Sequence, residues 1–273
     1  GLDNVAYHTN ESIFTDPQKP SHLLIVGGGP IGVEMAQAHI RLGCRVTVIE
    51  GAKILPRDDA ALVDILRQQL INEGVDLIEG VGVKNVANVT DKAGGAGVTL
   101  TLANEQHLTG SHLLIVTGRK PALDGLCLDK AGIGHSKSGI ITDARLRTSN
   151  RRVFAIGDVT GRQQFTHIAG YHAGIVIRNC LFKIPARIND DLVPWVTYCD
   201  PELAHVGLRE SDAIARFGAD KVVALETPLS GNDRAIAEGR SEGMVRAITH
   251  RNGRILGASI LAPAAGEMIH AWS

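Results

Sequence analysis

The chain has 273 residues, and at roughly 100–200 residues per domain this length predicts about two domains. Hydrophobic residues make up 44% of the chain, which is enough for a buried core and excludes an intrinsically disordered protein. The 28 basic and 29 acidic side chains leave a net charge of −1, which argues against a protein that binds nucleic acid or an anionic membrane through its overall charge.

The sequence predicts a cytoplasmic protein without a membrane span. No apolar run approaches the ~18 residues that a membrane helix needs, and no signal peptide opens the chain. The four cysteines are far apart in the sequence: Cys44, Cys127, Cys180 and Cys199. Because no two of them form a C-x-x-C pair, neither a zinc site nor a local redox dithiol is predicted.

The first part of the chain alternates between strand and helix patterns. In order, the predicted elements are a strand at 22–26, a helix after the glycine-rich turn 27–32 that ends at Gly43, a strand at 45–50, a helix at 58–73 and a strand at 75–78. The continuous apolar run 22–26 is typical of a central strand that is covered on both faces. This order predicts an α/β fold with a doubly wound parallel sheet.

The pattern then changes twice. An antiparallel excursion is predicted for 83–90 and 98–102 with Gly94 and Gly95 between them, followed by a buried strand at 112–118. A second unit is predicted from strands at 139–142 and 152–158 and a helix at 169–182. Beyond Pro185 an α+β pattern is predicted, with strands at 195–198 and 221–226, a helix at 210–217, and a hairpin of 244–249 and 255–261 around Asn252-Gly253.

The turn between the first strand and the first helix has the spacing G-x-G-x-x-G. Gly27 permits a tight turn, Gly29 lets a diphosphate approach the backbone, and Gly32 lets the helix pack closely against the strand. The amide groups and the positive dipole end of the helix then hold the phosphates. Glu50 ends the next strand, at the required distance of about 20 residues. A glycine-rich turn without a ligand is the alternative interpretation.

Glu50 also predicts which dinucleotide binds. A carboxylate at this position accepts hydrogen bonds from the ribose hydroxyls of NAD and repels the 2′-phosphate of NADP. Lys53 and Arg57 follow in the sequence and weaken this preference without reversing it. We therefore expect NAD rather than NADP, although Glu50 could also be a solvated acid at the end of a strand.

A second group of residues lies between Thr148 and Asp158. The predicted strand 152–158 places Gly157-Asp158 at its carboxyl end, where sheets of this type bind ligands. An aspartate held there is suited to bind a polyol hydroxyl. Taken alone, a Gly-Asp pair is more often a turn than a site.

These motifs together resemble the pyridine nucleotide–disulfide oxidoreductases, a flavoprotein family that includes dihydrolipoamide dehydrogenase and mercuric reductase. Residues 27–36 resemble the family's NAD loop, 115–121 the segment that closes the NAD domain, 148–158 the second FAD motif, and 193–207 the opening of the interface (dimerisation) domain. Residues 232–235, 238–239 and 257–260 continue the likeness, which covers essentially the whole chain. The resemblance implies an NAD-binding domain at 1–121, part of an FAD-binding domain at 122–190 and an incomplete α+β interface domain at 191–273.

The resemblance implies a set of cofactor-binding residues and no catalytic residue or metal ligand. For the nicotinamide nucleotide they are Gly27, Gly29, Pro30, Ile31, Gly32, Glu34, Glu50 and Gly118, and for FAD they are Gly157, Asp158, Thr166, His167 and Ile168. Glu34 matches a glutamate near the contact between nicotinamide and flavin, although an exposed helix acid is an equal alternative. His167 matches a helix N-terminus that points at the flavin, not a catalytic base.

Three parts of the family pattern are missing. The chain has neither the first G-x-G-x-x-G loop for FAD nor the C-x-x-x-x-C redox pair, and His270 lacks the surroundings of the family's His…Glu pair. We therefore expect a central and C-terminal part of a longer enzyme. Loss of one diphosphate loop predicts that FAD is absent and the protein colourless, whereas weak NAD binding survives.

The main hypothesis is a fragment of an NAD(P)H-dependent FAD oxidoreductase that passes hydride from nicotinamide to flavin and on to a disulfide or metal-ion acceptor. One alternative is a single-cofactor dehydrogenase, which does not account for Gly157-Asp158 or the α+β segment. Another is a truncated, inactive nucleotide-binding or dimerisation module. The resemblance also implies a homodimer formed through the C-terminal domain, and a small-molecule substrate.

Overall fold

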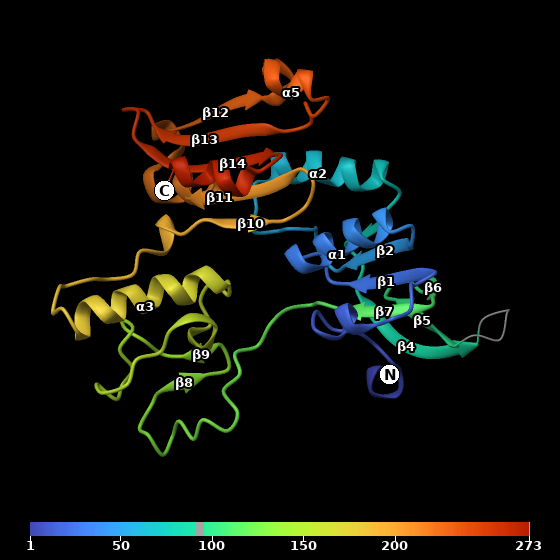
Figure 1. Cartoon of the computed structure of the whole chain (residues 1–273), viewed down its shortest axis with the longest axis horizontal. Helices are drawn as coiled ribbons and strands as arrows, with labels where there is room; N and C mark the ends of the chain where they lie inside the picture. Colours follow the sequence, from blue (N-terminus) through green and yellow to red (C-terminus); the bar gives the residue numbers. More distant parts are fainter. Residues whose placement is uncertain (91–95, 273) are drawn as a thin grey trace. The chain divides into compact units, whose positions relative to one another are not determined.

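The protein, seen here as a computed structural model, is described for residues 1–90 and 96–272 (Figure 1). It divides into two compact units, one formed by residues 1–118 together with the chain from 194 onward, the other by residues 119–193. The predicted break at Gly94 and Gly95 lies outside the described residues. The three-part division into 1–121, 122–190 and 191–273 stays a prediction.

A parallel sheet of four strands, in the order β3-β2-β1-β7, forms the first part of the larger unit. Its strands are β1 (His22–Val26), β2 (Arg45–Glu50), β3 (Asp76–Glu79) and β7 (His112–Ile115), and the crossover helices are α1 (Pro30–Arg41) and α2 (Ala60–Asn72). The predicted alternation of strands and helices is confirmed, and the mixed α/β class with it.

The two faces of this sheet are covered by different structures. Leu23 and Ile25 of β1 belong to the core that contains the buried side chains of α1 and α2. Leu24, between them, packs instead with a three-stranded antiparallel sheet of β4 (Val83–Thr90), β5 (Ala96–Leu102) and β6 (His107–Gly110). Because successive side chains of a strand point to opposite faces, a strand covered on both sides is apolar at every position.

The N-terminal segment runs along the edge of the parallel sheet. It contains two short 3-10 helices, η1 (Leu2–Asn4) and η2 (Ser12–Thr15). Between them, the backbone N–H of His8 donates to the carbonyl of Leu113 at 2.7 Å, and the N–H of Ile115 donates to the carbonyl of His8 at 2.9 Å. These bonds satisfy polar groups at the edge of β7 that would otherwise be unpaired.

The C-terminal part of the larger unit is a five-stranded antiparallel sheet in the order β10-β11-β14-β13-β12 (Figure 1). The strands are β10 (Trp195–Thr197), β11 (Glu202–Gly207), β12 (Val222–Pro228), β13 (Met244–His250) and β14 (Ile255–Ala262), with helices α4 (Glu210–Phe217), α5 (Asp233–Ala237) and α6 (Ala265–Met268) and 3-10 turns η5 (Ala219–Lys221), η6 (Leu229–Gly231) and η7 (Ile269–Trp272). The predicted hairpin around Asn252-Gly253 is confirmed, with Gly253 at a φ of 86°. Leu203 and Leu261 join the core under α1 and α2.

The smaller unit contains little regular structure. It consists of β8 (His135–Ser136), β9 (Gly139–Ile140), η3 (Gly157–Thr160), α3 (Thr166–Cys180) and η4 (Asp190–Leu192). The predicted strand at 152–158 is wrong: within the described residues this run has one isolated bridge, between Phe154 and Arg147, before η3 begins at Gly157. An apolar run becomes a strand only where a neighbour offers a hydrogen-bonding ladder, and here one bridge replaces it.

No helix within residues 1–90 and 96–272 is long and apolar enough to cross a membrane. All four cysteines are free thiols, of which Cys44 and Cys199 are buried and Cys127 and Cys180 are exposed. The absence of a metal site or redox pair among these cysteines stays a prediction from their spacing in the sequence. The cytoplasmic location stays a prediction.

Candidate functional site

The glycine turn between β1 and α1 is closely packed at two of its three glycines. Gly27 has a φ of 116°, and a Cβ atom there would lie 2.6 Å from the carbonyl oxygen of Val116 on the neighbouring chain segment. A Cβ atom at Gly32 would lie 1.9 Å from the carbonyl oxygen of Gly27. Neither position has room for a side chain, so both glycines are required by the fold itself.

Gly29 differs from these two glycines. Its φ of −73° suits any residue, and a Cβ atom there would meet no other atom within 4 Å. The backbone at Gly29 therefore faces open space at the N-terminus of α1. That open space is what close approach of a diphosphate to the backbone requires.

The first turn of α1 supplies amide groups for an anion. Pro30 is the first helical residue and has no N–H, and the N–H of Val33 already donates to the carbonyl of Gly29 at 3.0 Å. Helix geometry leaves the N–H groups of Ile31 and Gly32 without an intrahelical partner. Together with the positive end of the helix dipole they fit a diphosphate.

Glu50 lies beside the glycine turn, as the sequence predicted. Parallel pairing of β1 with β2 places the end of β2 next to the turn, where Glu50 Oε2 accepts a hydrogen bond from the N–H of Gly28 at 2.6 Å. Glu50 Oε1 accepts from the N–H of Ala52 at 3.0 Å. An ionised carboxylate has about four acceptor sites, so two remain for the hydroxyls of a ribose. The glycine turn and Glu50, the residue predicted to bind the ribose, are thus neighbours in the structure.

Two residues that the sequence analysis did not single out position the loop after Glu50. Glu79 ends β3 at the same edge of the sheet, and its Oε1 accepts from the N–H of Ile54 at 2.6 Å. Ile54 packs over the turn, where its Cγ2 would lie 2.8 Å from a Cβ atom at Gly28. Arg67 of α2 holds Glu79 by a bond from Nε to Oε2 at 2.9 Å. The signal for Glu79 was its position: like Glu50, it is an acid at the carboxyl end of a parallel strand.

Glu34 and Gly118 have other surroundings. Glu34 is half-buried on α1, and its Oε1 accepts from the backbone N–H of Tyr198 at 2.8 Å. This bond ties α1 to the segment between β10 and β11. Gly118 is exposed with a φ of 146°, just after β7. The predicted cofactor-binding roles of both residues stay predictions.

The second predicted group lies in the smaller unit, where Gly157 packs against α3. Gly157 is buried with a φ of 65°, and a Cβ atom there would lie 2.9 Å from the Cβ of Ala169. Asp158 is exposed in η3. Helix α3 begins at Thr166, with Thr166 and His167 exposed and Ile168 buried. Gly157-Asp158 and the first half of α3 are thus neighbours, although their predicted contact with FAD is untested.

His172 was not predicted as part of this group. It lies on the buried face of α3 with Ile168 and Ile175, and its Nδ1 accepts from the N–H of Gly157 at 3.0 Å. Burial lowers the pKa of His172, so the neutral ring carries its proton on Nε2, for which the described residues offer no partner. Only its spacing from Ile168 and Ile175 marked this histidine as inward-facing. It holds Gly157 in place.

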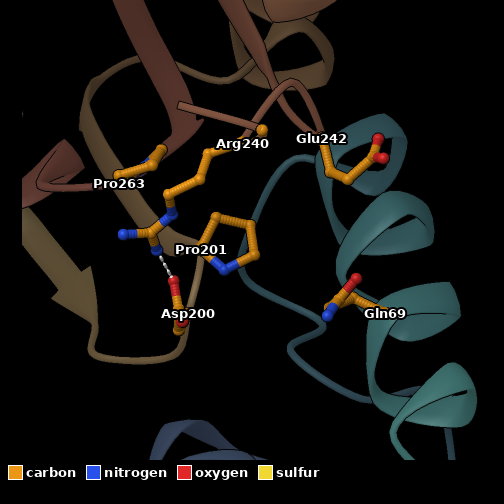
Figure 2. A pocket seen from close by; sticks show the side chains of 7 residues that line it. Gln69, Asp200, Pro201, Arg240, Glu242 and Pro263 are labelled. Carbon is orange, nitrogen blue, oxygen red and sulfur yellow. Dashed lines mark hydrogen bonds and ion pairs between the residues drawn. The ribbon is translucent and has the colours of Figure 1, made fainter. Parts of the chain in front are cut away.

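A small cavity of about 120 Å³ lies elsewhere in the larger unit (Figure 2). It is lined by Gln69, Asp200, Pro201, Gly239, Arg240, Glu242 and Pro263. Figure 2 shows the guanidinium of Arg240 reaching Asp200, which also accepts from Arg41 Nη1 at 2.9 Å. The cavity is far below the roughly 300–1,000 Å³ of ligand sites, and two of its charged residues, Arg240 and Asp200, bind each other. The residues around the cavity come from α2 and from the C-terminal part of the larger unit, and none of them belongs to the glycine turn.

Two family profiles match this chain. Residues 1–173 match the profile described as pyridine nucleotide-disulphide oxidoreductase, and residues 193–273 match the profile of the dimerisation domain of the same family. These ranges contain all the glycine and acidic residues discussed above.

Relatives and solved structures agree with the profiles. A mercuric reductase of Streptomyces lividans is 33% identical over 99% of this chain and 57% of that protein, and a dihydrolipoyl dehydrogenase of Bacillus subtilis (strain 168) is 32% identical over 92% of this chain and 54% of that protein. The flavoprotein disulfide reductase RclA from Escherichia coli superposes with a TM-score of 0.88 at 30% identity, over 98% of this chain and 61% of that chain. The chain therefore spans about half the length of the curated relatives it matches. On these matches, and on the fold and glycine turn that agree with them, the chain belongs to the pyridine nucleotide-disulphide oxidoreductase family.

Proposed function

We propose that this chain binds NAD(H) at the glycine turn of β1 and α1 and serves hydride transfer to FAD in an oxidoreductase of this family. One observation carries the proposal: the carboxylate of Glu50 bonds to the turn at Gly28, next to the open backbone of Gly29. The diphosphate would bind the first-turn amides of α1, and the adenosine ribose would bind the remaining acceptor sites of Glu50.

NAD is favoured over NADP by charge. A 2′-phosphate on the ribose would lie against the Glu50 carboxylate, and its two negative charges would be repelled. We expect NADH to bind more tightly than NADPH.

For FAD, the chain offers Gly157, Asp158 and the N-terminus of α3. Amide groups and the helix dipole there suit negative charge on a reduced flavin, which is the protein's contribution to the cofactor's potential. When bound, FAD supplies the redox chemistry that connects nicotinamide with a disulfide or metal-ion acceptor. That this chain alone lacks bound FAD stays a prediction, which the visible absorption of the purified protein tests.

Substitution of Gly29 tests the nucleotide site directly. Gly29→Ala adds a methyl group where the diphosphate would approach, in a place where it meets no protein atom. We expect NADH affinity, measured by titration calorimetry, to fall at least about tenfold, which corresponds to ~1.4 kcal/mol. The unfolding midpoint should change little, because nothing in the folded chain is displaced.

Gly82→Ala is the matched control, since Gly82, like Gly29, has open space at its Cβ position but is exposed and lies after β3. It should leave NADH binding unchanged. An unchanged affinity in Gly29→Ala, or no NADH binding by the folded wild-type chain, would contradict the proposal. Gly32→Ala is unsuitable as a test because its methyl group would overlap the carbonyl of Gly27 and disturb the fold.

We also propose that the chain forms a homodimer through its dimerisation domain, residues 193–273. The support is the family profile over this segment together with exposed apolar side chains on it: Tyr198, Leu225, Ile236 and Ile255. Sedimentation equilibrium should give twice the chain mass. A monomer at all concentrations up to about 100 µM would rule out a dimer of the affinity typical for specific interfaces.

A further inference from the structure

Three potential metal ligands meet where the N-terminal segment crosses the edge of the parallel sheet. Asp16 Oδ2 lies 3.0 Å from His8 Nε2 and 3.4 Å from His112 Nε2, and these three atoms all lie within 4.8 Å of one another. The two imidazole rings are stacked, with centroids 5.7 Å apart. His8 and Asp16 come from the N-terminal segment and His112 from β7, so the cluster joins residues about 100 positions apart.

The cluster is partly sheltered from water. The side chains of His8, Asp16 and His112 are 23%, 14% and 16% exposed. The backbone holds two of them: the N–H of His8 donates to the carbonyl of Leu113, and Asp16 Oδ1 accepts from the N–H of Gln18 at 2.8 Å. The second oxygen of Asp16 is thereby directed at the two histidines.

The hydrogen bonds of Ser111 fix the tautomer of His112. The hydroxyl of Ser111 donates to the carbonyl of His22 at 3.1 Å. In that arrangement it accepts at its 2.9 Å contact with His112 Nδ1, and Nδ1 carries the ring proton. In the neutral ring His112 Nε2 is then a lone-pair acceptor that faces the carboxylate of Asp16, another acceptor. Two acceptors that face each other need a proton or a metal ion between them.

We propose that His8, Asp16 and His112 bind a divalent transition-metal ion, with Zn²⁺ as the favoured occupant. Two imidazole nitrogens and one carboxylate oxygen suit zinc and its neighbours in the first transition row, whereas calcium and magnesium prefer oxygen alone. The contact of His112 Nδ1 with Ser111 is the outer hydrogen bond that orients metal-binding histidines. Three protein ligands leave a fourth tetrahedral position for water.

A metal at this position would attach the N-terminal segment to the sheet. The segment is also held by the backbone bonds of His8 at the edge of β7 and by the buried side chains of Val5 and Ile13. Because the site exists only when both parts are folded together, binding of the ion adds to the stability of the folded state. The site is separate from the glycine turn, and the proposal does not depend on nucleotide binding.

The experiment uses the full chain after removal of metals with a chelator. Exposed thiols are ligands for zinc, so Cys127 and Cys180 are first replaced by serine. Titration calorimetry with Zn²⁺ is expected to give one site per chain, and the unfolding midpoint is expected to rise with Zn²⁺. Substitution by Co²⁺ should give the visible absorption of a four-coordinate ion with nitrogen and oxygen ligands.

Asp16→Asn and His112→Asn are the test variants. Each should weaken zinc binding by more than about 100-fold, because loss of an outer hydrogen bond to a ligand alone costs about 10–100-fold. Asparagine at position 16 keeps an oxygen for the N–H of Gln18, so this variant is expected to fold, which circular dichroism checks. His135→Asn is the matched control, since His135 faces a single carboxylate, Asp129, at 3.4 Å.

The outcomes are distinct. One zinc per chain that is lost in both test variants and kept in His135→Asn supports the site. No binding by the folded parent chain, or equal affinity in Asp16→Asn, overturns it and leaves the contacts of Asp16 with His8 and His112 as contacts within the protein. NADH titration of the same variants is expected to be unchanged, so that failure of this site and failure of the nucleotide site are distinguishable.

Discussion

Asp58 is a buried carboxyl group just before helix α2. Its Oδ1 accepts a hydrogen bond from Trp195 Nε1 at 2.8 Å. Burial raises the pKa of Asp58 to about 6, because desolvation disfavours the charged form more than Trp195 and the positive charge of Arg209 favour it. At neutral pH Asp58 is ionised, and its buried charge lowers the free energy of unfolding.

The sign of the resulting pH dependence follows from the raised pKa. An ordinary aspartate in the unfolded chain titrates near 3.8, so between about pH 6 and pH 4 the folded protein binds a proton that the unfolded chain does not. This contribution to the unfolding free energy is fully present below pH 4 and is lost as the pH rises through 6. For this pKa difference it amounts to about 1 kcal/mol between pH 7 and pH 5.

Asp58→Asn should remove this dependence while keeping an oxygen for Trp195. Urea unfolding at pH 7 and pH 5 is expected to show a gain of about 1 kcal/mol on acidification in the wild type relative to the variant. Asp129→Asn, which removes an exposed carboxylate, is the control and should follow the wild type. Parallel pH profiles of wild type and Asp58→Asn would show that Asp58 titrates normally.

At the scale of single elements, the sequence predicted the bounds of helices and strands best where one apolar pattern runs through the whole element. The predicted strands 22–26 and 45–50 and helix 210–217 have the observed bounds. Helix α3 begins at Thr166 rather than at the predicted Ala169, since Ile168 already faces the buried side. Local apolar periodicity marks such elements, but the first turn of a helix has few intrahelical bonds and its limits are the least defined.

Strand β11 was missed for a different reason. Its centre contains His205, a polar residue that is 1% exposed and binds Ser259 Oγ at 2.7 Å and the carbonyl of Gly207 at 3.0 Å through its two ring nitrogens. A histidine interrupts the apolar pattern of a central strand, and its partner lies on β14, 54 residues away in sequence. Only the tertiary structure shows that this polar group is satisfied.

At the scale of the whole molecule, Arg246 connects the parallel part of the larger unit with its antiparallel sheet. Its guanidinium, 13% exposed, donates from Nη1 to Asp59 Oδ2 at 2.5 Å, from Nη2 to Glu210 at 2.6 Å and from Nε to Glu226 at 2.8 Å. Asp59 also caps α2, where it accepts from the N–H of Ala61 at 3.0 Å. One half-buried cation thus pairs with three acids from separate elements.

Arg246→Ala should destabilise the protein by about 3 kcal/mol or more, because it leaves the buried carboxylate of Asp59 without its counter-charge. Denaturant unfolding measures this loss. Arg234→Ala is the matched control: Arg234 is 83% exposed and pairs with Glu238, the residue just after α5, so its loss should change stability by less than about 1 kcal/mol. Equal effects of both substitutions would contradict the role of Arg246.

The sequence alone determined the α/β class, the glycine turn and the family, because these depend on local patterns: apolar runs, Gly27, Gly29 and Gly32, and an acid at the end of the next strand. The tertiary structure decided what depends on partners distant in sequence. It turned the predicted strand at 152–158 into an isolated bridge, set Glu50 against Gly28, and joined His8, Asp16 and His112. Hydrogen-bond ladders and ligand clusters need two segments that meet, and no single segment encodes where its partner will lie.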